Sequence, residues 1–231
     1  MKKYLSVFVV SVMAFTFSPA SGQDCTIYSD YEEGTSTKMV HYDKKDKSTG
    51  FTVTTVKEKK SIPGGTSLLF HQNYDNNEDY TFETEFEVKC VDGDVKVDMS
   101  KMIDPTMMSA YEDMEIDVVA DDMSIPKNAS PGDKLNDGSV TVTVDTGTPI
   151  NVTVTVSLSN RKVASKETVD TPAGSFECLK ITYDILSQVG FMKVRSSAAE
   201  YYNKKHGVIK SESFNKRGKS TGYSVIEEIN N

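Results

Sequence analysis

Apolar and polar residues alternate along most of the chain. In residues 80–91, Phe82 and Phe86 fall on one side of an extended chain, whereas Glu83 and Glu87 fall on the other. Because successive side chains of a β-strand point to opposite faces, this pattern predicts a strand with one face in water. Turn residues interrupt the alternation every eight to twelve positions, so we predict a mainly β, antiparallel protein. Similar stripes occur in residues 140–144, 152–158, 179–185, 191–195, 199–202 and 208–214.

Two segments that are far apart in the sequence repeat one another. Residues 42–53 read Tyr-Asp-Lys-Lys-Asp-Lys-Ser-Thr-Gly-Phe-Thr-Val, and residues 214–225 read Phe-Asn-Lys-Arg-Gly-Lys-Ser-Thr-Gly-Tyr-Ser-Val, with eleven of twelve positions identical or chemically similar. The pattern predicts two β-hairpins, each with a left-handed residue, at Asp46 and at Gly218. Asp tolerates that conformation better than most residues other than glycine. We infer a duplicated sheet motif rather than a solenoid, which needs at least about three adjacent repeats.

Residues 100–114 break the alternation, because apolar side chains recur there at the spacing of one helix face. Asp104 can cap a helix whose first turn begins with Pro105, a position where the missing amide hydrogen costs nothing. The sequence therefore predicts one short helix that covers a curved antiparallel sheet, shaped as a half-barrel or barrel. Residues 121–133 then read as a turn-rich connection back to the sheet.

The predicted helix lies in the part of the chain that is richest in methionine. Flexible, polarizable thioethers adapt to irregular apolar shapes. The helix can therefore plug the core of the protein or act as a lid over an apolar ligand. Thioethers also bind Cu(I), but no histidine or cysteine lies at close spacing. The residues assigned to a ligand site on this basis are Met102, Met107, Met108, Tyr111 and Met114.

The first residues have the pattern of an export signal. Two lysines precede an apolar run at residues 5–17, and Ala20, Ser21 and Gly22 supply the small residues that signal peptidase requires. We predict a signal peptide of residues 1–22 and a single β-rich domain of residues 23–231. A run of about 13 apolar residues is too short to remain as a membrane anchor. The mature chain is therefore expected in the periplasm or associated with the outer membrane, without a transmembrane segment.

The charge balance opposes a nucleic-acid partner. Without the leader and its two lysines, 24 basic and 34 acidic residues remain, which gives a formal net charge of −10. No basic stripe interleaved with aromatic residues occurs, and the basic residues of the repeated turns are expected to be solvated.

Three cysteines, Cys25, Cys90 and Cys178, follow the leader. An oxidising compartment allows two of them to pair and leaves one thiol, and all three pairings are open. We favour Cys90 with Cys178, because both lie in predicted strands, whereas Cys25 lies near an N-terminus that is expected to fray. Three unpaired thiols are the alternative.

The sequence contains no arrangement of residues that points to catalysis. His41, His71 and His206 lie far apart, with no second histidine at metal-ligand spacing, so each is expected on the surface or in a turn. Motifs for a serine nucleophile, a zinc hydrolase and a phosphate-binding loop are absent. The acidic residues 75–79 and 92–94 offer oxygen ligands for Ca²⁺ but lack the spacing of an EF-hand loop. We therefore expect no enzyme, no cofactor and no metal centre.

Several motifs resemble those of the TapB-like proteins, exported proteins common in Bacteroidetes that carry a domain of unknown function. The most specific is Thr-Pro-Ala-Gly-Ser-Phe-Glu-Cys at residues 171–178. The resemblance implies an extracytoplasmic β-rich fold, such as the open half-barrel of lipoprotein carriers, and implies no reaction. The other motifs that carry it are residues 179–183, 200–202, 207–212 and 215–219, together with shorter matches over nearly all of the mature chain.

These observations support one main expectation and two alternatives. We expect a non-enzymatic exported protein whose curved sheet binds a lipid-like or other apolar ligand, or a partner peptide. The first alternative is a structural or assembly component of the cell envelope, which contacts a protein partner through exposed strand edges or through Lys44 and Lys216 of the repeated hairpins. The second alternative is an enzyme of unfamiliar type.

Overall fold

The computed structural model describes residues 25–76, 81–101, 115–145, 147 and 152–230. Within these residues the chain forms thirteen β-strands and one short 3₁₀ turn, η1 (Met99–Lys101). The strands are β1 (Ser36–Asp43), β2 (Ser48–Ile62), β3 (Gly65–Asp75), β4 (Thr81–Val91), β5 (Asp94–Val97), β6 (Glu115–Asp121), β7 (Met123–Ile125), β8 (Gly138–Asp145), β9 (Val152–Thr171), β10 (Gly174–Val189), β11 (Met192–Asn203), β12 (Gly207–Asn215) and β13 (Ser220–Asn230).

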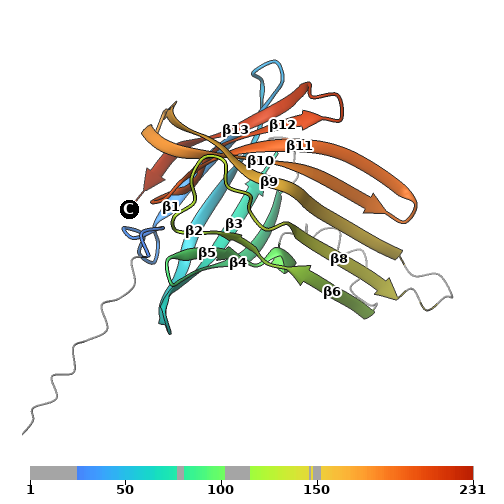
Figure 1. Ribbon diagram of the computed structural model, residues 1–231, viewed down its shortest axis with the longest axis horizontal. Helices are drawn as coiled ribbons and strands as arrows, with labels where there is room; N and C mark the ends of the chain where they lie inside the picture. Colours follow the sequence, from blue (N-terminus) through green and yellow to red (C-terminus); the bar gives the residue numbers. More distant parts are fainter. Residues whose placement is uncertain (1–24, 77–80, 102–114, 146, 148–151, 231) are drawn as a thin grey trace, which may run out of the picture.

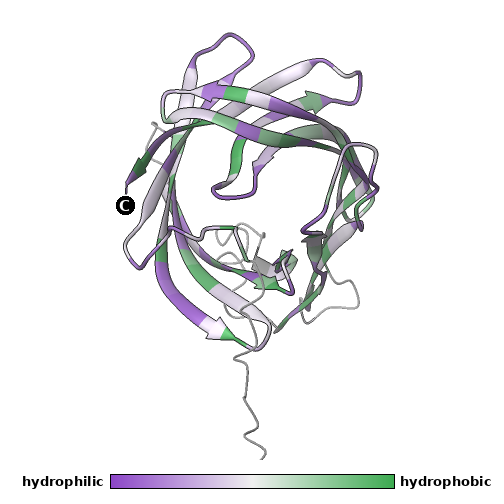
Figure 2. Ribbon diagram, turned by 60° about the vertical axis from the view of Figure 1, so that its left-hand side comes forward, coloured by the Kyte–Doolittle hydropathy of each residue, from purple (hydrophilic) through white to green (hydrophobic). Residues whose placement is uncertain are grey.

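The described strands form one antiparallel sheet in the order β6-β8-β9-β10-β11-β12-β13-β1-β2-β3-β4-β5-β7. The sheet curls around until it nearly closes into a barrel, as two directions of view show (Figure 1, Figure 2). The predicted mainly β, antiparallel, barrel-like architecture is confirmed. Most of the predicted helix, residues 102–114, lies outside the described residues, and so does the predicted signal peptide.

The two edge strands of the sheet, β6 and β7, are consecutive in the chain and are separated only by Asp122. The side chain of Asn136, just before β8, fastens this seam. Its Oδ1 accepts hydrogen bonds from the amide of Ser124 (2.9 Å) and from the hydroxyl of Ser124 (2.8 Å), and its Nδ2 donates to the carbonyl of Asp122 (2.8 Å). Arg161 of β9 donates from Nη1 to the carbonyl of Asn136 at 2.5 Å. Covalent continuity and these side chains therefore bring the two edges together.

The strand pattern agrees with the alternation in the sequence. In β4 the outward Glu83 and Glu85 are exposed, whereas Val88 and Cys90 are buried. The sequence pattern missed β6 and the three-residue β7, it marked only residues 152–158 of β9, and it divided β11, which is continuous. The three residues of β7 are too few to show an alternation, and β9 continues past residue 158 through a bulge at the left-handed residue Asn160.

The main core lies inside the barrel, toward the end where the described chain begins. It joins side chains from opposite walls, including Leu68 and Phe70 of β3 and Ile181 of β10. Two smaller clusters flank it. One lies around Cys178, Tyr201 and Ile226, and the other places Met99 against β8 and β9.

The repeated segments form the two predicted hairpins, β1–β2 and β12–β13. Asp46 and Gly218 both have positive φ, 61° and 71°, as their positions in the repeat predicted. The hairpins are neighbours, because β13 pairs with β1 in the register Tyr42 to Tyr223. Two copies that are remote in sequence therefore form one four-stranded part of the sheet.

Candidate ligand-binding site

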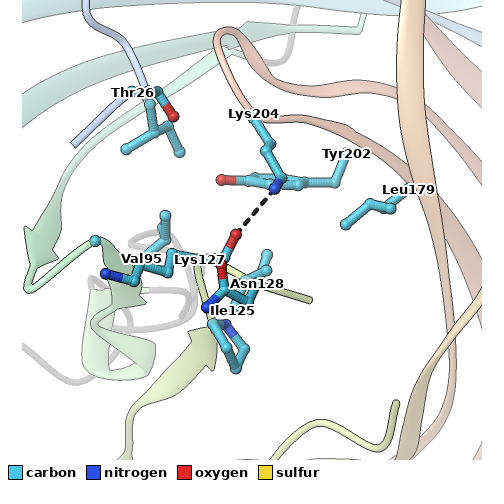
Figure 3. Close-up of a pocket in the computed structure, with 11 residues that line it drawn as sticks. Thr26, Val95, Ile125, Lys127, Asn128, Leu179, Tyr202 and Lys204 are labelled. Atoms are coloured by element: carbon cyan, nitrogen blue, oxygen red, sulfur yellow. Dashed lines mark hydrogen bonds between the residues drawn. The ribbon is translucent and has the colours of Figure 1, made fainter. Parts of the chain in front are cut away.

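A pocket of about 390 Å³ opens at the end of the barrel where the described chain begins. Five separate parts of the chain supply its walls: the N-terminal segment, the β4–β5 region, the connection after β7, strand β10 and the β11–β12 turn (Figure 3). The lining residues are Thr26, Ile27, Gly93, Val95, Ile125, Pro126, Lys127, Asn128, Leu179, Tyr202 and Lys204.

The floor of the pocket is part of the main core. Ile27, Val95, Leu179 and Tyr202 are all buried and all belong to the cluster that crosses the barrel. Burial raises the pKa of Tyr202, so its hydroxyl stays neutral. A ligand that enters this pocket therefore meets apolar side chains and one phenol.

The mouth of the pocket carries two exposed lysines, Lys127 and Lys204. Lys204 donates a hydrogen bond from Nζ to the carbonyl of Lys127 at 2.9 Å (Figure 3). The amide of Lys127 in turn donates to Oδ1 of Asp94 at 3.0 Å. These contacts hold the loop after β7 across the opening, with two ammonium groups next to an apolar floor.

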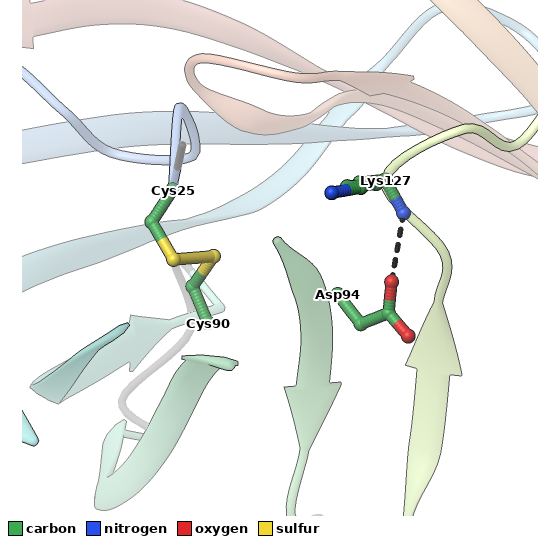
Figure 4. Close-up of a disulfide and its surroundings, with 4 residues drawn as sticks. All are labelled: Cys25, Cys90, Asp94 and Lys127. Carbon is green, nitrogen blue, oxygen red and sulfur yellow. Dashed lines mark hydrogen bonds between the residues drawn. A yellow bond between two sulfur atoms is a disulfide. The ribbon is translucent and has the colours of Figure 1, made fainter. Parts of the chain in front are cut away.

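A disulfide joins Cys25 to Cys90, with the two Cα atoms 5.7 Å apart (Figure 4). The predicted pairing of Cys90 with Cys178 is therefore wrong. Cys90 lies in β4 and Cys178 in β10, and six strands of the sheet separate these two. Cys178 is a buried free thiol whose pKa burial raises to about 11, which leaves it protonated and unreactive.

The N-terminal segment is packed rather than frayed, which explains the error. Tyr31 is 2% exposed, and the amide of Tyr28 donates to the carbonyl of Lys205 at 2.8 Å. The ring of Tyr28 lies 4.9 Å from that of Tyr31 and 5.0 Å from that of Phe70. The apolar residues that follow Cys25 were the signal that could have indicated an ordered segment. By fixing Cys25, the disulfide holds Thr26 and Ile27 in the pocket wall.

The site predicted from the sequence falls on other residues. Met102, Met107, Met108, Tyr111 and Met114 lie outside the described residues, so their role as ligand contacts stays a prediction. Met99, which precedes them, is 1% exposed and packs with Val140 and Leu158. Sequence reasoning missed the pocket, because its lining residues come from distant loops that share no motif.

The three histidines occupy different surroundings. His41 lies within β1 and forms 2.7 Å hydrogen bonds with Ser224 and Thr52, so the prediction of a surface or turn position does not hold for it. His71 lies in β3 near Glu83 and Glu85. His206 lies in the β11–β12 turn, where its ring packs against Tyr31.

A buried polar group also lies on β9, β10 and β11. Tyr183 donates to Oε1 of Glu200 at 2.8 Å, and burial raises the pKa values of both side chains. The charge of nearby Arg161 partly opposes the shift of Glu200. Arg161 itself is 5% exposed and donates to backbone carbonyls at the seam, so this group serves the closure of the barrel.

A larger groove of about 800 Å³ runs along β9 to β12. Its lining is rich in charged side chains, among them Lys162, Lys180, Asp184 and Glu212. It also contains apolar residues, among them Leu135, Ala198 and Phe214, so it differs from the smaller pocket in its larger number of charged side chains. Among the described residues, no group of three or more His, Cys, Asp or Glu side chains has the geometry of a metal site. In the same part of the chain, no helix is long and apolar enough to cross a membrane.

The family model for DUF3108-like proteins matches residues 32–226. The chain belongs to the DUF3108-like family. The matched residues reach every strand of the sheet, whereas Cys25, Thr26 and Ile27 at the pocket wall precede them.

Two solved structures share the fold of this family member. One is provisionally described as an exported protein with a YmcC-like fold from Bacteroides fragilis, with a TM-score of 0.72 and 24% sequence identity, covering 90% of this chain and 100% of that chain. The other is provisionally described as a lipoprotein from Parabacteroides distasonis, with a TM-score of 0.73 and 21% identity over the same shares. No curated protein matches the chain.

Proposed function

We propose that the protein is an exported, non-enzymatic binding protein for an amphipathic ligand with an apolar body and an anionic head. The observation that carries this proposal is the junction of two surfaces in one pocket. Ile27, Val95 and Leu179 form an apolar floor, and Lys127 and Lys204 stand at its mouth. Ligand pockets are commonly apolar cavities of about 300–1,000 Å³ with a few polar groups that orient the ligand.

Export is supported by three further features. The disulfide between Cys25 and Cys90 is a bond typical of oxidising compartments outside the cytoplasm. The leader pattern of residues 1–22 and the descriptions of the two structural neighbours agree with the same location. Periplasmic or outer-membrane placement, and the narrower kinship with TapB-like proteins, remain predictions from the sequence.

The proposal is tested with a fluorescent fatty acid as the probe. Substitution Ile125→Trp places a large ring in the pocket, and the double substitution Lys127→Glu with Lys204→Glu reverses the charge at the mouth. We expect each change to weaken binding about tenfold or more. The loss of one ion pair, or the filling of the apolar site, should each cost about 1–3 kcal/mol of binding free energy. Lys57→Glu with Lys96→Glu is the matched control, because both lysines are exposed on the outer wall.

Three outcomes are informative. Weaker binding in both pocket variants, with the control unchanged, supports the proposal. Equal affinity in all four proteins places the ligand elsewhere and refutes the site. Native mass spectrometry of the protein purified from its own envelope then identifies any natural ligand, and the repeated absence of a bound molecule together with no binding of the probe overturns the function.

A further inference from the structure

Three neighbouring hairpins point to the end of the barrel opposite the pocket. They are β10–β11, β12–β13 and β1–β2, which are consecutive in the sheet order. Because adjacent strands are antiparallel, their turns reach the same end, and all three lie on the side away from the labelled C-terminus (Figure 1). The pocket, by contrast, contains residues of the β11–β12 turn at the other end.

The turns of the repeated hairpins are built in the same way. Oδ1 of Asp43 accepts the amides of Lys45 (2.7 Å) and Lys47 (3.0 Å). Oδ1 of Asn215 accepts the amides of Arg217 (2.9 Å) and Lys219 (3.2 Å). These bonds fix the backbone of each turn, so the basic side chains project from rigid supports. All six basic residues are exposed: Lys44, Lys45, Lys47, Lys216, Arg217 and Lys219.

The two turns are also held beside one another. The ring of Tyr42 stacks on that of Tyr223, with centroids 5.0 Å apart and planes 16° apart. The hydroxyl of Tyr223 donates to Oδ1 of Asp46 at 3.1 Å, which connects one hairpin to the turn of the other. The six basic residues therefore form one surface instead of two separate turns.

The third hairpin carries apolar side chains into solvent. At its tip, Phe191 is 94% exposed, Met192 60% and Val194 64%. Ser196 is level with Asn215 of the neighbouring turn, so β11 continues four residues farther, to Met192. At about 3.3 Å per residue, Met192 lies roughly 13 Å along the strand beyond the level of Asn215.

Basic side chains accompany this apolar tip. Lys193 and Arg195 are exposed on the same strand, and Arg195 lines one small hollow together with Lys216 of the next turn and Asp184 of β10. The surface thus contains eight basic residues, and the only carboxylates within the three turns are Asp43 and Asp46. None of the eight forms an ion pair with a described residue. This is the reverse of the chain as a whole, whose formal net charge is −8.

We propose that these three hairpins dock the protein on an anionic lipid surface, with Phe191 and Met192 entering the bilayer interface and the basic turns contacting the headgroups. An exposed apolar tip flanked by cations is complementary to such a surface, whose interface accepts apolar side chains and whose charge attracts Lys and Arg. The apolar residues lie on a narrow projection rather than on a flat patch, a shape that a fluid bilayer can surround.

The absence of tryptophan from the chain makes a direct experiment possible. The variant Phe191→Trp carries the only indole, at a position whose exposure makes the substitution harmless to the fold. Vesicles of phosphatidylcholine mixed with phosphatidylglycerol are expected to shift its emission to the blue, and vesicles of phosphatidylcholine alone are expected to have little effect. Added salt should reverse the shift, since headgroup attraction by exposed cations is screened.

Variants in full-length mature protein separate the two contributions. In vesicle co-sedimentation, Lys45→Glu with Lys216→Glu should lower partitioning by about 30-fold or more, because each Lys near an anionic surface is worth about fivefold. Phe191→Ser with Met192→Ser should also lower it, with less dependence on salt. Lys57→Glu with Lys96→Glu, which changes the net charge equally on the outer wall, should leave it unchanged.

Several results would overturn the proposal. They are an unshifted indole emission of the Phe191→Trp variant on anionic vesicles, equal loss in the outer-wall control, or no effect of either hairpin variant. Crosslinking of a single envelope protein through Lys44 or Lys216, without any vesicle binding, would assign the surface to a protein partner instead. Because the pocket lies at the other end of the barrel, failure of this test leaves the ligand-binding proposal standing.

Discussion

Arg161 and Asn136 hold the barrel closed at the seam, where the guanidinium of one donates to the backbone carbonyl of the other at 2.5 Å. The seam has no ladder of backbone hydrogen bonds between its two edge strands, β6 and β7, within the described residues. At this position, side-chain contacts therefore connect two strands, whereas backbone hydrogen bonds connect the other neighbouring strands.

The substitution Arg161→Met should lower the free energy of unfolding by about 3 kcal/mol, because it leaves buried carbonyls and the Glu200 carboxyl without their cationic partner. Urea denaturation followed by circular dichroism measures this change. Arg195→Met is the matched control and should shift stability by no more than about 0.5 kcal/mol, since its side chain is exposed. Equal effects of the two substitutions would contradict the role of the seam.

The disulfide between Cys25 and Cys90 should contribute about 4 kcal/mol to stability, because it closes a loop of 65 residues in the unfolded chain. Denaturant unfolding with and without reductant measures the difference. The non-reduced, unfolded protein should show one reactive thiol, and peptide mapping should locate it at Cys178. A free thiol at Cys25 would instead support the pairing with Cys178 that the sequence favoured.

Gly207→Ala should destabilise the protein by about 2 kcal/mol or more, since the residue has a φ of 74° and a Cβ would lie within 3 Å of the Tyr28 ring system. Gly190→Ala separates the two causes. Gly190 also has positive φ, 56°, but a Cβ there meets nothing within 4 Å. Thermal unfolding should therefore show a smaller loss for Gly190→Ala, and losses of equal size would mean that Tyr28 moves freely aside.

Stability should fall in mild acid partly because of His41. Burial lowers the pKa of this imidazole below its usual 6.5, so the folded state favours the neutral ring. The contribution of neutral His41 to the free energy of unfolding is complete above pH 6.5. It is lost as the pH falls from there through the lower pKa of the folded state. His41→Gln should therefore flatten the decline of the unfolding free energy between about pH 7 and pH 5.

His206→Gln provides a comparison, because burial and the charge of Lys205 also lower the pKa of that imidazole. His41 lies in β1 and His206 in the β11–β12 turn, so the two substitutions should act independently. Their effects on the slope of the unfolding free energy against pH should therefore add. A slope that is unchanged in both variants would show that carboxyl groups alone determine the acid response.

The sheet and its hairpins could be predicted because their signals are local. Alternation of side chains indicates a strand wherever one face is wet, and the turn chemistry around Asp46 and Gly218 is complete within a few residues. The contact between Tyr42 and Tyr223 could not be predicted, because the sequence of a strand does not specify which distant strand will be its neighbour. The same limit explains the incorrect pairing of Cys90 with Cys178.

The candidate pocket could not be predicted from the sequence either, because it also depends on contacts between distant parts of the chain. Its apolar floor looks like ordinary core at each position, as Leu179 and Val95 illustrate. Its lysines lie in turns, where solvation is the common expectation. Only the closure of the sheet brings Lys127 and Lys204 together at one opening.

Strand β13, which ends at Asn230, occupies the middle of the sheet and pairs on one side with β1, the first strand of the chain. An emerging polypeptide can form the hairpins of its first half, but β1 has no second neighbour until the last residues have been delivered. The pairing of β1 with β13 must therefore wait for the last strand, and such long-range pairing is slow. A chain that crosses a membrane from its N-terminus would therefore complete this part of the sheet only after β13 has emerged.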